Sequence, residues 1–242
     1  MKLNPIYFLL AIVLIGTSLN PATAYCKSDS TVVLTNLNEF EAITFSSRVK
    51  AHITIKEGAK PEVKLRGSYE AFDYYRIDVT NKMLHIEPEK ERYSYHNVAI
   101  YADIVIPTIN DLELSGSSEV NIAGLLNTNK FSISSSGSTN VTIGNINTAH
   151  FDAALSGVSN VIVNNGTATK AAYALSGCSG VSAYNFVCQT VGIRASGTSV
   201  CKVNATKLLD VALSGASKTK YRGHPEKIEQ SLSGSSKLRQ EE

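Results

Sequence analysis

A serine-glycine pair recurs seven times in the second half of this 242-residue chain, and its spacing constrains the fold more than any other feature. Successive glycines of these pairs are 21, 20, 20, 20, 18 and 19 residues apart. A period of about twenty residues with constant turn chemistry is typical of a solenoid, in which each repeat is one coil that packs against its neighbours. These corner glycines are Gly116, Gly137, Gly157, Gly177, Gly197, Gly215 and Gly234.

Apolar residues alternate with other residues on both sides of each corner glycine. The positions two, four and six residues before it, and four and six residues after it, are mostly aliphatic or aromatic. Around the third corner glycine these positions hold Phe151, Ala153, Leu155, Val161 and Val163. Because side chains alternate between the two faces of a strand, this pattern predicts one strand on each side of the corner, with one face inward.

Two turn positions recur in the repeats. A serine precedes each corner glycine and a second hydroxyl follows two places later, as in Ser156-Gly157-Val158-Ser159. We expect these serines to shape the corner, because seven equivalent serines cannot all be activated nucleophiles and no Gly-x-Ser-x-Gly elbow occurs. The eighth position after the glycine is mostly glycine or asparagine, which predicts a second, left-handed corner at Gly124, Asn145, Asn165, Asn185, Ala205 and Gly223.

These patterns predict an all-β, single-domain parallel β-solenoid, similar to a right-handed β-helix, with coils of about 18–21 residues and Ser-Gly corners. We place the domain at residues 37–240, with the regular repeats at 111–240. Residues 37–110 lack the Ser-Gly pair but keep the strand alternation, so we expect irregular first coils there. The inward positions become polar in the last two copies, as a solenoid needs at an open end.

The first 36 residues are expected to lie outside the solenoid. Lys2 precedes an apolar run that ends in Ala22-Thr23-Ala24, which predicts a signal peptide over residues 1–24 and a linker over 25–36. A lipid anchor at Cys26 is the weaker alternative, because Tyr25 stands where a small residue is needed. We therefore expect an exported protein in the periplasm, on the outer surface or outside the cell, with no transmembrane span in the mature chain.

Composition and cysteine spacing narrow the kinds of partner and site that this chain is expected to have. The net charge of +2 gives no strong field that would favour nucleic acid as a partner. Cys26, Cys178, Cys188 and Cys201 show neither CxxC nor Cys/His spacing, so we expect no metal site, and we expect no cofactor. No two of them share a column in adjacent coils. A disulfide would therefore require distorted coils, and Cys201 is interpreted as a buried free thiol.

Several segments together resemble a known family, the head GIN domain of putative auto-transporter adhesins. The resemblance covers residues from about 37 to 240 and implies a secreted or surface β-solenoid of a Gram-negative bacterium with a role in attachment. It supplies no catalytic or binding residues. The segments that carry it are Phe40-Glu41-Ala42-Ile43, Val49–Ile55, Leu84-His85-Ile86, Ile104-Val105-Ile106-Pro107 and Leu112–Ser118.

A carbohydrate-active β-helix enzyme is the first alternative function. Such an enzyme needs a cluster of acids on one face. Asp111, Asp152, Asp210 and Glu229 share one outward column, five residues before the corner glycine, but they are spread over several coils. We interpret this column as a solvated face. The second alternative is a purely structural component of the cell envelope.

An aromatic patch near the first coils is the candidate ligand-binding site. Tyr74 and Tyr75 precede a charged loop, and Tyr93, Tyr95 and His96 follow it. Aromatic faces beside polar groups stack on sugar rings and are favoured at protein interfaces. We therefore predict a non-catalytic, secreted or cell-surface binding or adhesion module. Its expected partner is a surface glycan or a protein of a host or neighbouring cell.

Overall fold

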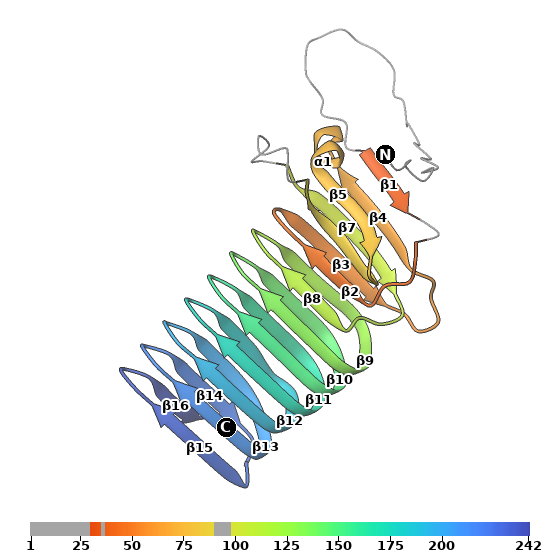
Figure 1. Ribbon diagram of the computed structural model, residues 1–242. Helices are drawn as coiled ribbons and strands as arrows, with labels where there is room; N and C mark the ends of the chain where they lie inside the picture. Colours follow the sequence, from red (N-terminus) through yellow and green to blue (C-terminus); the bar gives the residue numbers. More distant parts are fainter. Residues whose placement is uncertain (1–29, 35–36, 90–97) are drawn as a thin grey trace.

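The computed structural model describes residues 30–34, 37–89 and 98–242. In these ranges the chain forms one 16-stranded sheet that winds into a stack of coils, with β1 at one end and β15 and β16 at the other (Figure 1). The elements are β1 (Ser30–Leu34), β2 (Ala42–Phe45), β3 (Val49–Ile55), β4 (Glu62–Gly67), α1 (Tyr69–Tyr74), β5 (Tyr75–Thr80), β6 (Met83–Pro88), β7 (Ile100–Ile106), β8 (Asp111–Leu114), β9 (Glu119–Ser135), β10 (Asn140–Leu155), β11 (Asn160–Leu175), β12 (Gly180–Ala195), β13 (Val200–Leu213), β14 (Lys218–Arg222), β15 (Lys227–Leu232) and β16 (Lys237–Gln240).

The regular repeats form the predicted parallel solenoid. Strands β9 to β13 each follow the chain around most of a coil, and each pairs in parallel with the strand one coil later. The pairing is in register with the sequence repeat. Phe131, for example, pairs with Phe151 of the next coil, and Phe151 pairs with Ala171. Each column of the sequence alignment is therefore a row of stacked side chains along the solenoid.

Glycine is required at the Ser-Gly corner for two reasons. All seven corner glycines have positive φ angles, between 69° and 93°. They also stack closely: a Cβ atom on Gly157 would lie 2.6 Å from the carbonyl oxygen of Gly137 in the previous coil. The hydroxyl two places later closes the corner, since Ser159 is fully buried and its Oγ donates to the carbonyl of Ser156 at 2.6 Å. The predicted structural role of these serines is confirmed.

The second corner differs from the prediction. Gly124 and Gly223 have positive φ angles of 88° and 86° as expected, but in the third regular coil the left-handed residue is Gly166, one position later. Asparagine tolerates positive φ without requiring it, and the strand pairing shifts register at two of these corners, between Ile143 and Asn145 and between Ser182 and Val187. The positions predicted to be left-handed that have negative φ are Asn145, Asn165, Asn185 and Ala205.

The inward columns form one continuous core along the stack. Phe151 is fully buried, and its ring lies 6.1 Å from that of Phe131, 5.8 Å from that of Tyr173 and 5.3 Å from that of Phe186. Ser135 is the polar exception in a leucine column. Its hydroxyl hydrogen-bonds to Thr139 and Ser159 of the corner, which satisfies it inside the core.

The first coils are more irregular than the alternation predicted. Strands β2, β3, β6, β7 and β8 continue the parallel stack. Three other strands are antiparallel instead: β4 against β7, β1 against β4, and β5 against β6. A short helix, α1, precedes β5 and begins where Ser68 Oγ accepts the amide of Ala71. Alternation of side chains is the same in both kinds of strand, so it could not reveal this change of direction.

Candidate functional site

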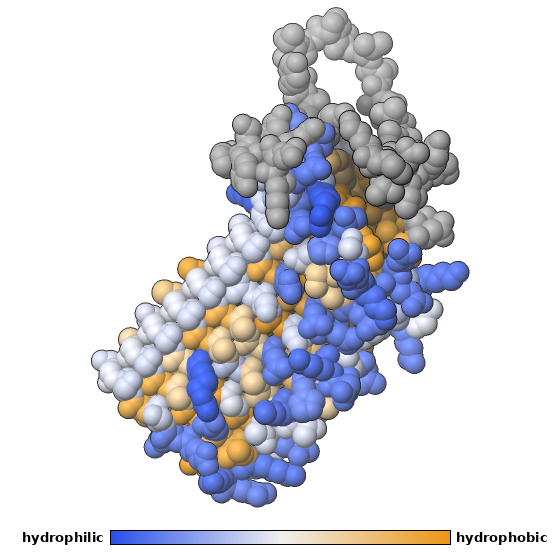
Figure 2. Space-filling model, in the orientation of Figure 1, coloured by the Kyte–Doolittle hydropathy of each residue, from blue (hydrophilic) through white to orange (hydrophobic). Residues whose placement is uncertain are grey.

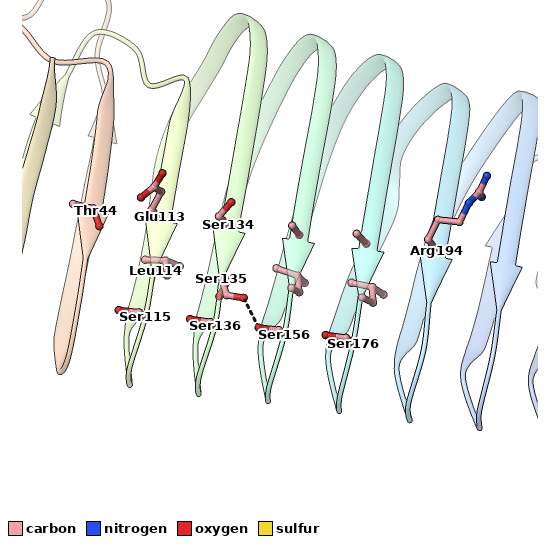
Figure 3. Close-up of a pocket in the computed structure, with 14 residues that line it drawn as sticks. Thr44, Glu113, Leu114, Ser115, Ser134, Ser135, Ser136, Ser156, Ser176 and Arg194 are labelled. Atoms are coloured by element: carbon pink, nitrogen blue, oxygen red, sulfur yellow. Dashed lines mark hydrogen bonds between the residues drawn. The ribbon is translucent and has the colours of Figure 1, made fainter. Parts of the chain in front are cut away.

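A shallow groove of small side chains runs along the outer face of the stack, beside the Ser-Gly corners (Figure 3). Its central column lies three residues before the corner glycine, and β-pairing holds its members in register from coil to coil. The inward neighbours in each strand, such as Leu155 and Leu175, are buried and fix the direction of the outward ones. The groove encloses about 570 Å³. From one end to the other, the central column is Thr44, Glu113, Ser134, Ala154, Ala174 and Arg194.

The groove carries a negative charge toward one end and a positive charge toward the other. Glu113 lies next to Thr44 near one end and Arg194 lies at the other, with hydroxyl and methyl groups between the two charges. Arg194 donates to Asp210 over 2.6 Å, and this hydrogen bond raises the pKa of its guanidinium, which stays charged. One wall is the ladder of corner serines, including Ser136, Ser156 and Ser176, which Figure 3 shows aligned from coil to coil. Such a surface presents evenly spaced hydroxyls beside an apolar strip.

A second depression of about 430 Å³ lies on the other side of the same central column. Asp152, Lys170 and Gly192 line it, and it shares Ala154 and Ala174 with the first groove. Figure 2 shows orange, pale and white side chains along the coils on the left of the view, with blue ones along the right side and at the lower end of the stack. This outer face is therefore hollowed across several stacked strands, in the direction of the solenoid axis.

The acid column behaves as a solvated face. Asp111 and Asp152 are separated by Ser132 in the register, so their carboxylates lie two coils apart, about 10 Å. Asp210 and Glu229 are neighbours in the register, but each carboxylate is paired with a cation. Asp210 binds Arg194 at 2.6 Å, and Glu229 binds Lys227 at 2.5 Å. Within the described residues, no three His, Cys, Asp or Glu side chains gather as ligands for one metal ion.

The predicted aromatic patch is only partly described. Tyr93, Tyr95 and His96 lie outside the described residues. Tyr74 is half-buried and meets Tyr75 edge to face at 5.2 Å. Tyr75 is a core residue, 5% exposed, and cannot stack on a ligand in this position.

Tyr75 instead ties the start of β5 to the chain before β3. Its hydroxyl accepts from the amide of Arg48 at 3.0 Å and donates to the carbonyl of the same residue at 3.1 Å. Burial is the main cause that raises the pKa of this phenol. Tyr75 therefore has a structural role.

The cysteines of the described residues are free thiols. Cys178 is exposed at a corner, whereas Cys188 and Cys201 point into the core. Burial raises the pKa of Cys188 to about 12 and raises that of Cys201 further. Tyr173 lies near both thiols, and burial also raises its pKa strongly. The prediction of a buried free thiol at Cys201 is confirmed, and these groups are part of the core.

Sequence reasoning missed the groove, and it interpreted most of one charged surface only as part of the cap on the last coils. The groove depends on an outward column that was not compared between coils, although its small residues were visible in the same alignment. The charged surface consists of six cations on the outward positions of β13, β14 and β16, and we call it the basic face. Its residues are Lys202, Lys218, Lys220, Arg222, Lys237 and Arg239.

Stacked parallel coils with corner glycines define the class of protein, which is a parallel β-solenoid. Residues 39–225 match the family model described as "Putative auto-transporter adhesin, head GIN domain", and the chain belongs to this family. The resemblance noted from the sequence is thus confirmed. Among curated proteins, no match to this chain was found.

Solved structures share the fold. A putative adhesin from Bacteroides fragilis NCTC 9343 is 24% identical, with a TM-score of 0.79 over 89% of this chain and 98% of its own. A putative adhesin from Parabacteroides merdae ATCC 43184 is 15% identical, with a TM-score of 0.71 over 90% and 98%. A putative lipid binding protein from Parabacteroides distasonis ATCC 8503 is 18% identical, with a TM-score of 0.68 over 90% and 98%. In the described ranges of the present chain, no helix is long and apolar enough to cross a membrane.

Proposed function

We propose that this protein is a non-catalytic binding module of the cell surface, which attaches to a glycan or to a protein of a host or neighbouring cell. The family and the structural neighbours are named as adhesins, which supports attachment as the general role. The observation that carries the proposal is the groove, which the in-register coils hold open from Glu113 to Arg194. A rigid groove costs little ordering entropy when an extended ligand lies in it.

The chemistry of the groove suits a polymer with alternating apolar and hydroxyl surfaces. Ala154 and Ala174 offer flat apolar contact, and Ser156 and Ser176 offer hydroxyls beside them. Arg194 can donate further hydrogen bonds at one end, because a guanidinium carries five N–H groups, of which Nη2 donates one to Asp210 and Nη1 donates one to the Ile193 carbonyl. The ion pairing of Asp210 and Glu229 supports a binding role over acid-base cleavage of the ligand.

The test is a binding screen of residues 25–242 against immobilised glycans and extracellular-matrix proteins. The Ala154→Arg/Ala174→Arg double variant fills the groove with two exposed side chains. Thr167→Arg/Thr169→Arg adds the same two side chains at exposed positions that line neither depression, and it serves as the control. We expect saturable binding that the groove variant loses and the control keeps.

The aromatic patch is the competing location for the same function. A Tyr93→Ala/Tyr95→Ala variant should leave binding unchanged if the ligand lies in the groove. Loss of binding in this variant, with binding retained in Ala154→Arg/Ala174→Arg, would move the site to the first coils. No binding to any glycan or matrix protein would reject the attachment role and favour a purely structural component of the envelope.

A further inference from the structure

The basic face lies at the C-terminal end of the stack, and its cations are confined to β13, β14 and β16. On this outer face, the three strands β10 to β12 carry uncharged outward residues, namely Asn140, Thr142, Asn160, Ile162, Gly180 and Ser182. Farther from the basic face, the column of Asn140 holds an ion pair between Lys50 and Glu119. One of the two columns becomes basic at Lys202 of β13 and the other at Lys218 of β14. Ser182 pairs with Lys202, which pairs with Lys220, which pairs with Arg239. In the second column Val200 pairs with Lys218, and Lys218 with Lys237.

This arrangement places like charges next to one another. Neighbouring strands lie about 4.8 Å apart, so each cation faces another across the pairing, and like charges in that position destabilise a sheet. Protection of the open edge explains part of the pattern, because lysines on an edge strand discourage pairing with another chain. It accounts for Lys237 and Arg239 on β16. It does not account for Lys202 and Lys218, which lie on strands that already have partners on both sides.

A carboxylate is already bound to the basic face. Glu241 Oε1 lies 2.5 Å from Lys220 Nζ, and its Oε2 accepts a 2.5 Å hydrogen bond from the hydroxyl of Tyr184. These two contacts hold the pKa of Glu241 below its ordinary value. Arg222 stacks over the Tyr184 ring at 4.5 Å, and Lys202 lies 6.0 Å from the same ring. The face therefore supplies the ammonium and hydroxyl donors that coordinate a carboxylate.

We propose that the basic face binds an acidic polysaccharide through the carboxylates of its uronic-acid units, with Glu241 occupying one of these carboxylate positions in the free protein. The proposal takes from the proposed function only that the protein is a binding module, and it does not depend on the groove. A flat ladder of cations along the stack matches a linear chain of repeated charges. Both columns of cations continue across successive strands, so several carboxylates can be met at once.

The experiment measures binding of residues 25–242 to polygalacturonate, whose only charged groups are carboxylates, with neutral dextran alongside. We expect saturable binding to polygalacturonate and none to dextran at this face. Raising NaCl from about 50 to about 300 mM should weaken it by at least about tenfold, because salt screens exposed charges and competes for the polyanion.

The test variant replaces three cations of the basic face with neutral residues taken from the same two columns. Lys202→Ser/Lys218→Asn/Lys237→Asn copies residues found at equivalent positions of earlier coils and leaves Lys220 and Arg222 in place. It should weaken binding by at least about tenfold, as expected for the loss of three direct charge contacts. The control Lys56→Ser/Lys60→Ser/Lys64→Ser removes the same charge from exposed lysines at the other end of the stack and should stay within about twofold of wild type.

Glu241→Gln gives an independent test that does not rely on loss of binding. It removes the competing carboxylate, so affinity for polygalacturonate should rise by about twofold or more. Equal affinity of wild type and the Lys202→Ser/Lys218→Asn/Lys237→Asn variant would overturn the proposal. So would tighter binding of double-stranded DNA or of phosphatidylserine vesicles at matched charge concentration. Binding of an uncharged glycan that only Ala154→Arg/Ala174→Arg abolishes, without any polygalacturonate binding, would reject this inference and retain the proposed function.

Discussion

A Cβ atom on Gly157 would lie 2.6 Å from the carbonyl oxygen of Gly137 in the preceding coil and 3.1 Å from its amide nitrogen. The same contact recurs along the corner: a Cβ on Gly177 would lie 2.7 Å from Gly157 O. The corner is thus a column of backbone packed against backbone. Such a contact cannot relax by a side-chain rotation, so the stack depends on the absence of a side chain at these positions.

Gly157→Ala is expected to destabilise the protein by about 2–5 kcal/mol, because it combines a strained positive φ with a backbone clash. Gly192→Ala is the matched control. Gly192 has no positive φ and no atom within 4 Å of a Cβ position, so alanine there should be neutral or stabilise by up to about 1 kcal/mol. Urea unfolding followed by circular dichroism compares the two. Equal midpoints for both variants would contradict this account of the corner.

Phe151→Ala should cost about 3–5 kcal/mol, since the ring is fully buried and contacts aromatic rings from three other positions. Val158→Ala provides the contrast. Val158 is 55% exposed at a corner, so its truncation should change the free energy of unfolding by less than about 0.5 kcal/mol. Thermal melting of both variants measures the difference. A small effect of Phe151→Ala would mean that the inward columns do not form a tightly packed core.

Ser159→Ala should destabilise by about 1–2 kcal/mol, because it removes the buried hydrogen bond to the Ser156 carbonyl. Ser159→Thr should be nearly neutral, since Thr139 occupies the equivalent position one coil earlier and is equally buried. Chemical denaturation of the pair separates the hydroxyl from the volume of the side chain. If threonine were as harmful as alanine, the hydroxyl would not be the group that closes the corner.

The free energy of unfolding should fall at alkaline pH, because the core contains buried thiols. Burial raises the pKa of Cys188 from an ordinary 9.0 to about 12, so the native state keeps a proton that the unfolded chain loses. The resulting stabilisation is fully present below pH 9 and is lost as pH rises from about 9 towards 12. The free energy of unfolding should fall by up to about 1.4 kcal/mol per pH unit for each such thiol.

The Cys188→Ala/Cys201→Val variant tests this pH dependence with residues taken from the same columns. Ala168 pairs with Cys188 in the preceding coil, and Val181 pairs with Cys201. Urea midpoints between pH 8 and pH 11 should decline less steeply in this variant than in wild type. Cys178→Ala, at an exposed corner, should follow the wild-type curve. Parallel curves for all three proteins would show that the thiols do not set the alkaline limit.

The repeat made most of the fold predictable from the sequence. Alignment on the corner glycines identified the inward columns correctly, because burial and alternation are coupled within every strand. The polar residue Ser135 interrupts a column that holds Leu114, Leu155 and Leu175 in other coils. Its bonds to Thr139 and Ser159 depend on side chains brought together by two coils, which no single repeat contains.

The candidate sites were harder to predict because they depend on the outer columns. Asn145 and Asn165 suggested a left-handed corner, but they retain negative φ, and composition alone cannot distinguish tolerance from requirement. Tyr75 has the sequence context of a surface aromatic residue and is instead bonded to Arg48 in the interior. Tyr75 is buried because β5 runs antiparallel to β6 in the irregular first coils. Alternation of apolar residues does not indicate strand direction, so it could not predict this burial.

The in-register stacking also bears on how such a chain can change in length over evolution. The coils that end at Gly157 and Gly177 each comprise 20 residues and present equivalent pairing edges above and below. Recombination that duplicates or deletes one such unit would preserve every column on both sides of the join. Each event would alter the reach of the rod by one strand spacing, about 4.8 Å. The outer face can therefore be lengthened by gene duplication while the two differently built ends, one antiparallel and one basic, are left as they were.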